Sequence, residues 1–334
     1  MNTILPDFVY FDETINSAIT LIELLKVNVT RFTIRNALYS NPNFPNISLS
    51  DLVTVLNEWH IQGLGCKLDS ATLQQVPLPI IAYLKEDNIA TFVVVTFVTS
   101  DKVKYIHPSL GHCCESVSLF EAKWSGVVLV PDFDNTAGEE FFKKNKQAEQ
   151  KAKRDYKKSL HIIDDFLTNA ESEYIIETSQ KNDLFNRSKL GKEGKEISMH
   201  RTSYSAYIES RNDPVFCHIY QKASELIKKD LSYFESLQCV RYHPKQEFKY
   251  HFDSNKDIRR THTFLIYLNE TFEGGETSFP ELGIRITPKT GRCVVFQNMD
   301  EYENIIPYSA HAGLPVKTGV KYACNLWVNN SPFQ

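Results

Sequence analysis

The amino-acid composition of this chain changes abruptly near its middle. Between residues 143 and 158 the sequence is dense in Lys and Arg, nearly free of large apolar side chains, and without Pro or Gly. Such a run predicts a solvated, largely helical linker. A chain of 334 residues also exceeds the usual size of one domain. We therefore predict a first domain over residues 1–132, a charged helical linker over 133–158 and a second domain over 159–334.

Composition narrows the class of protein. Hydrophobic residues make up 42% of the chain and charged residues 23%, which is ordinary for a globular protein with a full core. The formal net charge of -4 predicts no general attraction to nucleic acid or to an anionic membrane. Residues 1–11 lack a basic segment, which predicts no secretory signal. Seven scattered cysteines without a CxxC pair indicate free thiols in a reducing cytoplasm.

Apolar periodicity in the first domain indicates both helices and strands. Residues 15–25 and 50–59 are typical of amphipathic helices, and Ser48 or Ser50 could cap the second one. Four runs rich in β-branched and aromatic residues predict strands, at 80–84, 91–98, 103–106 and 127–130. The first domain is therefore expected to be an α+β module.

The second domain is expected to be mostly strands. One helix is predicted over residues 170–179. Many short apolar runs separated by turn signals favour a β-sandwich or barrel. The predicted strands are 237–242, 248–252, 263–268, 284–287, 293–296 and 322–328.

The pattern His251-Phe252-Asp253 is the first candidate for chemistry. On a strand, residues i and i+2 point to one face, so this His and Asp could hold one ion together. His311 lies far along the chain and could return on a neighbouring strand. Two imidazoles and one carboxylate that leave open positions are the ligand set of non-haem iron(II) oxygenases. Taken alone the pattern is weak, because such tripeptides arise by chance.

Lys321 follows His311 by ten residues and begins an apolar strand. A cation in an apolar pocket is costly unless it meets an anion, and the distal carboxylate of 2-oxoglutarate would be such a partner. The alternative is an ordinary lysine at the edge of a strand.

The order of several motifs from about residue 160 to 330 resembles the prolyl 4-hydroxylase family. The domain opening is His161 to Leu167, and a short polar motif follows at Arg201-Thr202-Ser203. The remaining motifs are Arg241-Tyr242-His243, His251-Phe252-Asp253, residues 260–269, residues 273–280, residues 291–296, His311 to Val316, Gly319 to Tyr322 and Trp327.

This resemblance implies a function and a site. It implies His251, Asp253 and His311 as iron ligands, and Lys321 as partner of the distal carboxylate of 2-oxoglutarate. Tyr242 and Thr263 would add hydroxyl hydrogen bonds, and Trp327 would line the same pocket. The fold implied is a double-stranded β-helix (jelly roll) with flanking helices. Fe(II), 2-oxoglutarate and O2 would be consumed or bound, with release of succinate and CO2, and ascorbate is a further candidate cofactor.

Residues 27–131 resemble the bacteriocin-processing cysteine peptidases, which cleave leader peptides at double-glycine sites and have a papain-like α+β fold. The similar segments are residues 48–52, 56–57, 65–68, 77–84, 91–95 and 124–129. The catalytic groups of the family are missing. No cysteine precedes Cys66, Thr91 stands where the base belongs, and His107-Pro108 replaces the orienting Asp. A cysteine peptidase needs a thiolate beside a base, so we expect no proteolysis.

The sequence therefore predicts a 2-oxoglutarate-dependent dioxygenase that hydroxylates a peptidyl residue, with proline as the first candidate. The same chemistry on another residue, a free amino acid or a small molecule stays open. A non-catalytic peptide-binding protein is disfavoured because the candidate iron ligands and Lys321 are intact. The first domain could recruit a peptide or protein substrate, or it could only stabilise the second.

Overall fold

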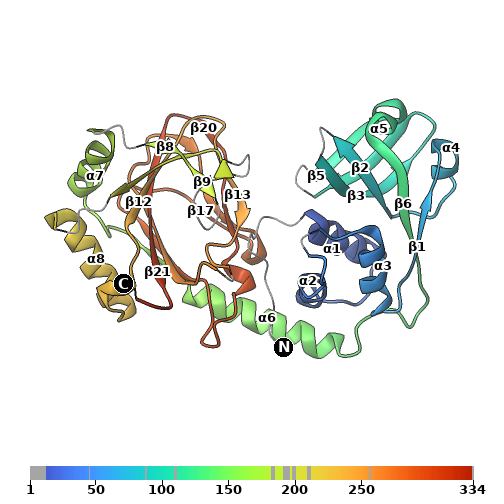
Figure 1. The fold of residues 1–334 in the computed structure, drawn as a ribbon, viewed down its shortest axis with the longest axis horizontal. Helices are drawn as coiled ribbons and strands as arrows, with labels where there is room; N and C mark the ends of the chain where they lie inside the picture. The colour runs from blue at the N-terminus through green and yellow to red at the C-terminus, as the bar shows by residue number, and fades with distance from the viewer. Residues whose placement is uncertain are drawn as a thin grey trace. The chain divides into compact units, whose positions relative to one another are not determined.

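The computed structural model of the protein describes residues 13–44, 46–86, 89–108, 111–181, 185–190, 196–197, 201–208, 212–255 and 257–332. The described chain divides into two compact units, with the division between Lys151 and Ala152 (Figure 1). This division lies within a long helix, α6 (Phe142–Ser159), which covers the lysine-rich run. Residues 1–11, for which no secretory signal was predicted, lie outside the described residues.

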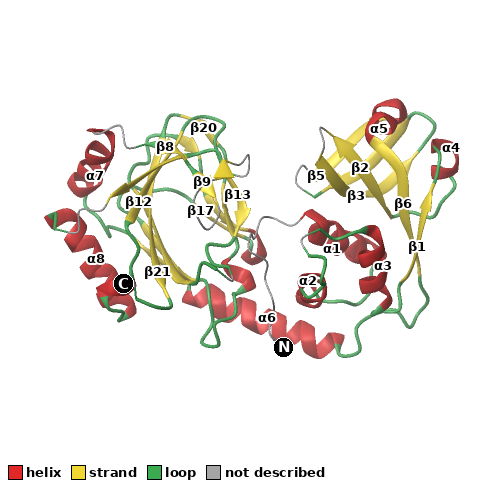
Figure 2. Cartoon of the chain, in the orientation of Figure 1, coloured by secondary structure: helices red, strands yellow, loops and turns green. Residues whose placement is uncertain are grey.

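The first unit is a six-stranded antiparallel sheet with helices on both faces (Figure 2). The strands follow the order β1-β6-β2-β3-β4-β5. Their bounds are β1 (Gln62–Lys67), β2 (Ile80–Glu86), β3 (Ile89–Val98), β4 (Lys102–His107), β5 (Gly111–Ser116) and β6 (Trp124–Asp132). The helices are α1 (Glu13–Leu25), α2 (Arg31–Tyr39), α3 (Leu49–Asn57), α4 (Ser70–Leu73) and α5 (Val117–Lys123).

Alternation along the strands gives this sheet two buried faces. In β2, Ile81 packs with helices α1, α2 and α3, whereas Ile80 and Ala82 pack on the other face with α5. Helix α3 begins where the sequence places a cap, because the Ser48 side chain accepts from the backbone N–H of Asp51 in a capping box. The predicted α+β class and both predicted helices of this unit are confirmed.

The second unit contains two larger antiparallel sheets that form a double-stranded β-helix, and two small two-stranded sheets. The two-stranded sheets pair β9 (Lys189–Leu190) with β10 (Glu196–Ile197) and β15 (Glu273–Gly274) with β20 (Val316–Thr318). The large sheet has the order β7-β18-β14-β21-β12-β11-β8, and the smaller one β13-β19-β16-β17. The strands of the large sheet are β7 (His161–Ile163), β8 (Asn186–Arg187), β11 (Tyr204–Ile208), β12 (Leu237–Tyr242), β14 (Arg260–Tyr267), β18 (Cys293–Gln297) and β21 (Lys321–Asn329). Those of the small sheet are β13 (Phe248–His251), β16 (Thr277–Phe279), β17 (Ile284–Ile286) and β19 (His311–Gly313).

Each face of the large sheet packs against its own apolar core. Helices α7 (Asn169–Lys181) and α8 (Pro214–Ile227) cover its outer face, where Phe264 and Ile266 of β14 are buried (Figure 2). The inner face points into the barrel, where Leu265 and Tyr267 pack with residues of the small sheet. This alternation is the reason that every second residue of β14 is available to line an internal site.

The predicted strands of this unit are all confirmed within a few residues, with one correction. The strand predicted over 248–252 ends at His251, so Asp253 is not on the strand and lies in the bend after it. Helices α2 and α8 and strands β1 and β5 were not predicted. The apolar runs of α2, β1 and β5 are short or interrupted, whereas α8 has regular helical spacing of its buried residues Phe216, Ile219, Tyr220 and Ala223 that the prediction overlooked. Among the described helices, none combines the length and apolar character that a membrane crossing requires.

Candidate metal and cosubstrate site

Three predicted ligands meet inside the barrel of the second unit. His251 ends β13, Asp253 follows in the bend, and His311 begins β19. Strands β13 and β19 pair so that His251 and His311 lie opposite each other. One ligand atom from each of the three residues lies within 4.8 Å of the others, and all three side chains are buried. The group could hold one metal ion.

Both imidazoles are oriented by backbone carbonyls. Nδ1 of His251 lies 2.7 Å from the Lys249 carbonyl oxygen, and Nδ1 of His311 lies 2.9 Å from that of Ser309. Each Nδ1 therefore donates its proton, which leaves the Nε2 lone pair free to bind a metal. Both Nε2 atoms face Asp253, at 3.6 Å and 3.8 Å from its carboxylate oxygens.

The protonation states suit metal binding. Burial, and after it the charge of His251, lowers the pKa of His311 to about 4, so this imidazole is neutral at neutral pH. Burial alone would raise the pKa of Asp253, but His311, His251 and Arg260 together hold that pKa well below its usual range. The site thus presents a carboxylate and a neutral imidazole, which are the forms that ligate metals.

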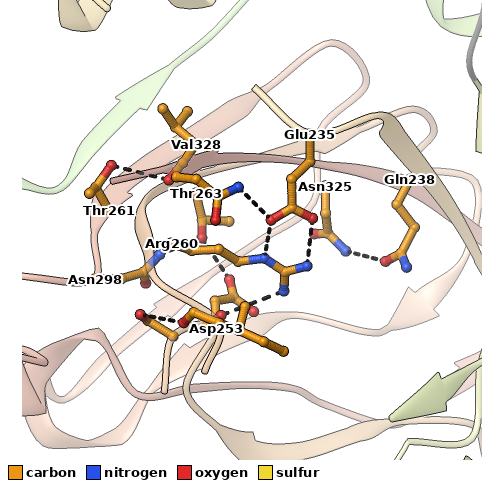
Figure 3. A network of polar contacts seen from close by, with 12 residues as sticks. Glu235, Gln238, Asp253, Arg260, Thr261, Thr263, Asn298, Asn325 and Val328 are labelled. Atoms are coloured by element: carbon orange, nitrogen blue, oxygen red, sulfur yellow. Dashed lines mark hydrogen bonds and ion pairs between the residues drawn. The ribbon is translucent and has the colours of Figure 1, made fainter. Parts of the chain in front are cut away.

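A buried polar network surrounds Asp253 (Figure 3). The Thr263 hydroxyl donates to Asp253 Oδ2 at 2.7 Å, and the Asn298 amide donates to the Thr263 oxygen at 2.8 Å. Arg260 donates to both carboxylate oxygens of Glu235, at 2.6 Å and 2.7 Å, and its guanidinium lies 3.6 Å from the centre of the Trp327 ring. Arg260 Nη1 also donates to the Asp253 carbonyl at 3.5 Å, so that Thr263 and Arg260 together hold the bend that carries Asp253 against the large sheet.

Lys321 lies inside the same barrel and is buried. Its ammonium donates to the Gly275 carbonyl at 2.7 Å and lies 5.3 Å from the ring centres of both Tyr242 and Tyr267. Burial lowers the pKa of Lys321 to about 8, although Glu276 acts in the opposite direction. Within the described part of the chain, no carboxylate is in hydrogen-bond contact with this buried cation, which suits it to an anionic ligand.

Trp327 lines the barrel at the same level of the sheet as Thr263, because the two residues are paired across β14 and β21. Its indole Nε1 is buried and has no hydrogen-bond partner among the described residues. The Oδ1 atom of Asn298 is also buried without a hydrogen-bond partner among the described residues. Unsatisfied buried polar atoms beside a candidate site are consistent with groups that a ligand or water completes.

Comparison with known proteins gives the class of this unit. Residues 237–329 match the sequence model of the 2OG-Fe(II) oxygenase superfamily. They contain His251, Asp253, His311 and Lys321. The second unit carries a 2OG-Fe(II) oxygenase domain. We refer to it below as the oxygenase unit.

Individual relatives carry the name prolyl 4-hydroxylase. A protein of Acanthamoeba polyphaga mimivirus so named is 36% identical over 146 residues, which are 40% of this chain and 60% of that protein. Prolyl 4-hydroxylase 2 of Arabidopsis thaliana is 28% identical over 52% of this chain and 67% of its own length. A crystal structure of the viral collagen prolyl hydroxylase of Paramecium Bursaria Chlorella virus-1 is 28% identical, with a TM-score of 0.44, over 52% of this chain and 97% of that one.

The first unit matches a different family. Residues 19–136 match the sequence model of the Peptidase C39 family. At the position expected for the catalytic base, the Thr91 hydroxyl donates to Glu13, the first residue of α1, at 3.0 Å. The start of α1 and Thr91 of β3 are therefore adjacent, and they bring together a carboxylate and a hydroxyl. The absence of proteolysis stays a prediction.

Sequence reasoning missed several residues of the site. Tyr267 is fully buried, donates to the Thr277 hydroxyl at 2.6 Å and contacts Lys321 through its ring. Arg260 and Asn298 support Asp253 from the sheet. The signal for Tyr267 was present in the sequence, because it follows Thr263 by four residues and must share its face on one strand. No local pattern indicated Asn298, which follows the end of β18.

Proposed function

We propose that this protein is an Fe(II)- and 2-oxoglutarate-dependent dioxygenase that hydroxylates a peptidyl residue, with proline as the residue. The observation that carries the proposal is the buried group of His251, Asp253 and His311, whose ligand atoms lie within 4.8 Å of one another. Because both Nδ1 atoms are engaged by carbonyls, the free Nε2 atoms and the carboxylate suit Fe(II) with open positions beside it.

Side chains at one end of the barrel would bind the metal, and those at the other end would bind the cosubstrate. His251, Asp253 and His311 would hold the iron. Lys321 would bind the distal carboxylate of 2-oxoglutarate by a charge-assisted hydrogen bond, with Tyr242 and Trp327 lining the pocket. Bound Fe(II), with 2-oxoglutarate and O2, supplies the oxidation that inserts one oxygen atom into a C–H bond and releases succinate and CO2. The buried walls exclude water from that step.

Proline is proposed as the substrate residue because the mimivirus and Arabidopsis relatives bear the name prolyl 4-hydroxylase. We include O2 as co-reactant and ascorbate as a reductant of the enzyme on the same ground.

For the rest of the chain we propose that residues 1–132 form a peptide-binding module without peptidase activity, joined through 133–158 to the oxygenase domain at 159–334. Support comes from the match to the Peptidase C39 family and from the replaced catalytic positions. The module would recruit an extended peptide to the oxygenase. We also propose a cytoplasmic location, since all seven cysteines are free.

The test is mass spectrometry of proline-containing peptides incubated with the full chain, Fe(II), 2-oxoglutarate, O2 and ascorbate. We expect a gain of one oxygen atom on proline, equal in amount to the succinate formed. Omission of 2-oxoglutarate should abolish it. Succinate formation with oxygen on another residue would exclude proline, and the lack of any iron-dependent succinate would exclude the dioxygenase.

A further inference from the structure

Thr263 sits between two buried partners whose chemistry determines the direction of its hydrogen bonds. The carboxylate of Asp253 only accepts, so the single hydroxyl proton of Thr263 goes to it, at 2.7 Å. The Asn298 side chain must then donate to the Thr263 oxygen, at 2.8 Å. Both Thr263 and Asn298 are almost completely buried, and Figure 3 shows the chain of contacts.

The Asn298 side chain is held in turn by its own backbone. Its N–H donates to the Thr261 carbonyl at 2.7 Å, and its carbonyl accepts from the Ile306 N–H at 2.9 Å. The relay Asn298–Thr263–Asp253 is therefore anchored in the large sheet. It reaches Asp253, which lies on a bend beyond the end of β13 and has no strand pairing of its own.

This arrangement leaves Thr263 without a proton for a second carboxylate. The distal carboxylate of 2-oxoglutarate needs donors, and the buried ammonium of Lys321, which lies beside the rings of Tyr242 and Tyr267, is such a donor. Tyr267 is four residues beyond Thr263 on β14, which separates their backbones by roughly 13 Å. Thr263 thus belongs to the metal end of the barrel.

We propose that Thr263 is a positioning residue for the metal ligand Asp253, with Asn298 behind it, and that it does not bind the cosubstrate. The inference rests on the proposed function in that Asp253 is taken as a metal ligand. Partners of this kind orient the ligand before the metal arrives, and their loss commonly weakens metal binding about 10- to 100-fold.

The experiment titrates the full-length apoprotein with Co(II) alone, without 2-oxoglutarate, and follows the visible absorption of the bound ion. Thr263→Val keeps the shape and removes the hydroxyl, and Thr263→Ser restores it. Thr261→Val is the matched control, because this hydroxyl on the same strand donates to the Val328 carbonyl and not to Asp253. Asn298→Ala is a second variant that leaves Thr263 itself unchanged. Thermal unfolding of each preparation confirms that it is folded.

We expect Co(II) binding about 10- to 100-fold weaker in Thr263→Val, wild-type binding in Thr263→Ser and Thr261→Val, and a smaller loss in Asn298→Ala. The KM for 2-oxoglutarate at saturating Fe(II) should stay unchanged in Thr263→Val.

Unchanged Co(II) binding with a raised KM for 2-oxoglutarate would overturn the inference and leave the proposed function intact. A wild-type protein that binds Co(II) no better than Asp253→Ala would instead remove the metal site and the proposed function with it. If Thr263→Val does not fold, unchanged Co(II) binding in Asn298→Ala overturns the relay.

Discussion

Each ligand of the candidate site is oriented before any metal binds. The imidazoles of His251 and His311 are each tied to the carbonyl two residues earlier, and Asp253 is tied to Thr263. Metal binding to such a site costs less side-chain conformational entropy than binding to a set of flexible ligands would. The same contacts fix the tautomer of both histidines, so that each Nε2 atom directs its lone pair toward the centre of the site.

Removal of the carboxylate is the most direct test of this centre. We expect Asp253→Ala to reduce iron-dependent succinate production by more than about 100-fold, because a lost ligand should exceed the cost of a lost supporting contact. Succinate is measured by chromatography at saturating Fe(II). Full turnover in this variant would remove Asp253 from the ligand set.

Lys321 should act on the cosubstrate and leave the metal untouched. Lys321→Met removes the buried ammonium, and truncation of one partner of such a pair costs about 2–5 kcal/mol. We expect 2-oxoglutarate affinity to fall at least about 30-fold, while Co(II) affinity changes little. An equal loss of both affinities would point to general damage of the barrel.

The lowered pKa of Lys321 also predicts a dependence on pH. Burial brings that pKa to about 8, so the free protein loses the ammonium proton as the pH rises through this value. Only the charged form pairs well with a carboxylate, and affinity for 2-oxoglutarate should therefore fall above about pH 8, by up to about tenfold per pH unit. Isothermal titration of the Co(II)-loaded protein between pH 7 and 9 measures this, and Lys321→Met should lack the trend.

At the scale of the element, the alternation of β14 and β21 separates structure from chemistry. Phe264 and Ile266 of β14 join the outer core under α7 and α8, whereas Thr263 and Tyr267 face the interior. In β21, Lys321 and Trp327 point inward while Leu326 packs outward. One strand pair thus supplies residues to both ends of the site without interrupting the sheet.

The turn before β18 should not accept a side chain at position 291, where the chain has glycine. Gly291 has φ of +75°, and a Cβ there would lie 2.1 Å from the Leu167 carbonyl oxygen. Gly283 also has a positive φ, +65°, but nothing lies within 4 Å of its Cβ position. We expect Gly283→Ala to cost about 1 kcal/mol and Gly291→Ala about 3 kcal/mol or more, since only the second adds a clash. Calorimetry of the full chain measures both, and equal costs would contradict the argument.

At the scale of the whole molecule, the two units have separate cores. Apolar clusters on both faces of the six-stranded sheet stabilise the first unit, and two others stabilise the oxygenase unit.

Deletion of residues 1–132 tests the recruiting role. If the first unit binds an extended peptide, the truncated protein should lose turnover on long peptides by about tenfold or more and keep its turnover on short ones, because a second binding site raises the effective concentration of substrate. Mass spectrometry of hydroxylated peptides gives the ratio. An unchanged ratio of long to short would leave the first unit with a stabilising role only.

Much of the architecture followed from local pattern. The helix at Glu13–Leu25, the cap at Ser48 and the strand at Leu237–Tyr242 could be predicted because periodicity and capping are properties of adjacent residues. Helix α8 was missed although Asp213 and Pro214 provide a cap and a first turn. The placement of Asp253 on a strand was wrong, since the end of β13 depends on its pairing with β19.

The sequence by itself indicated which residues make up the candidate centre: two histidines, a carboxylate and a lysine, in an order typical of an iron oxygenase. The order of motifs can be read directly from the chain, without knowledge of the fold. Only the tertiary structure shows which side chains lie at which end of the barrel. The hydroxyl of Thr263 belongs to Asp253 and the ring of Tyr267 lies beside Lys321, since such contacts depend on sheet register and on bends between strands. Register is set by packing across the whole unit, and no short stretch of sequence encodes it.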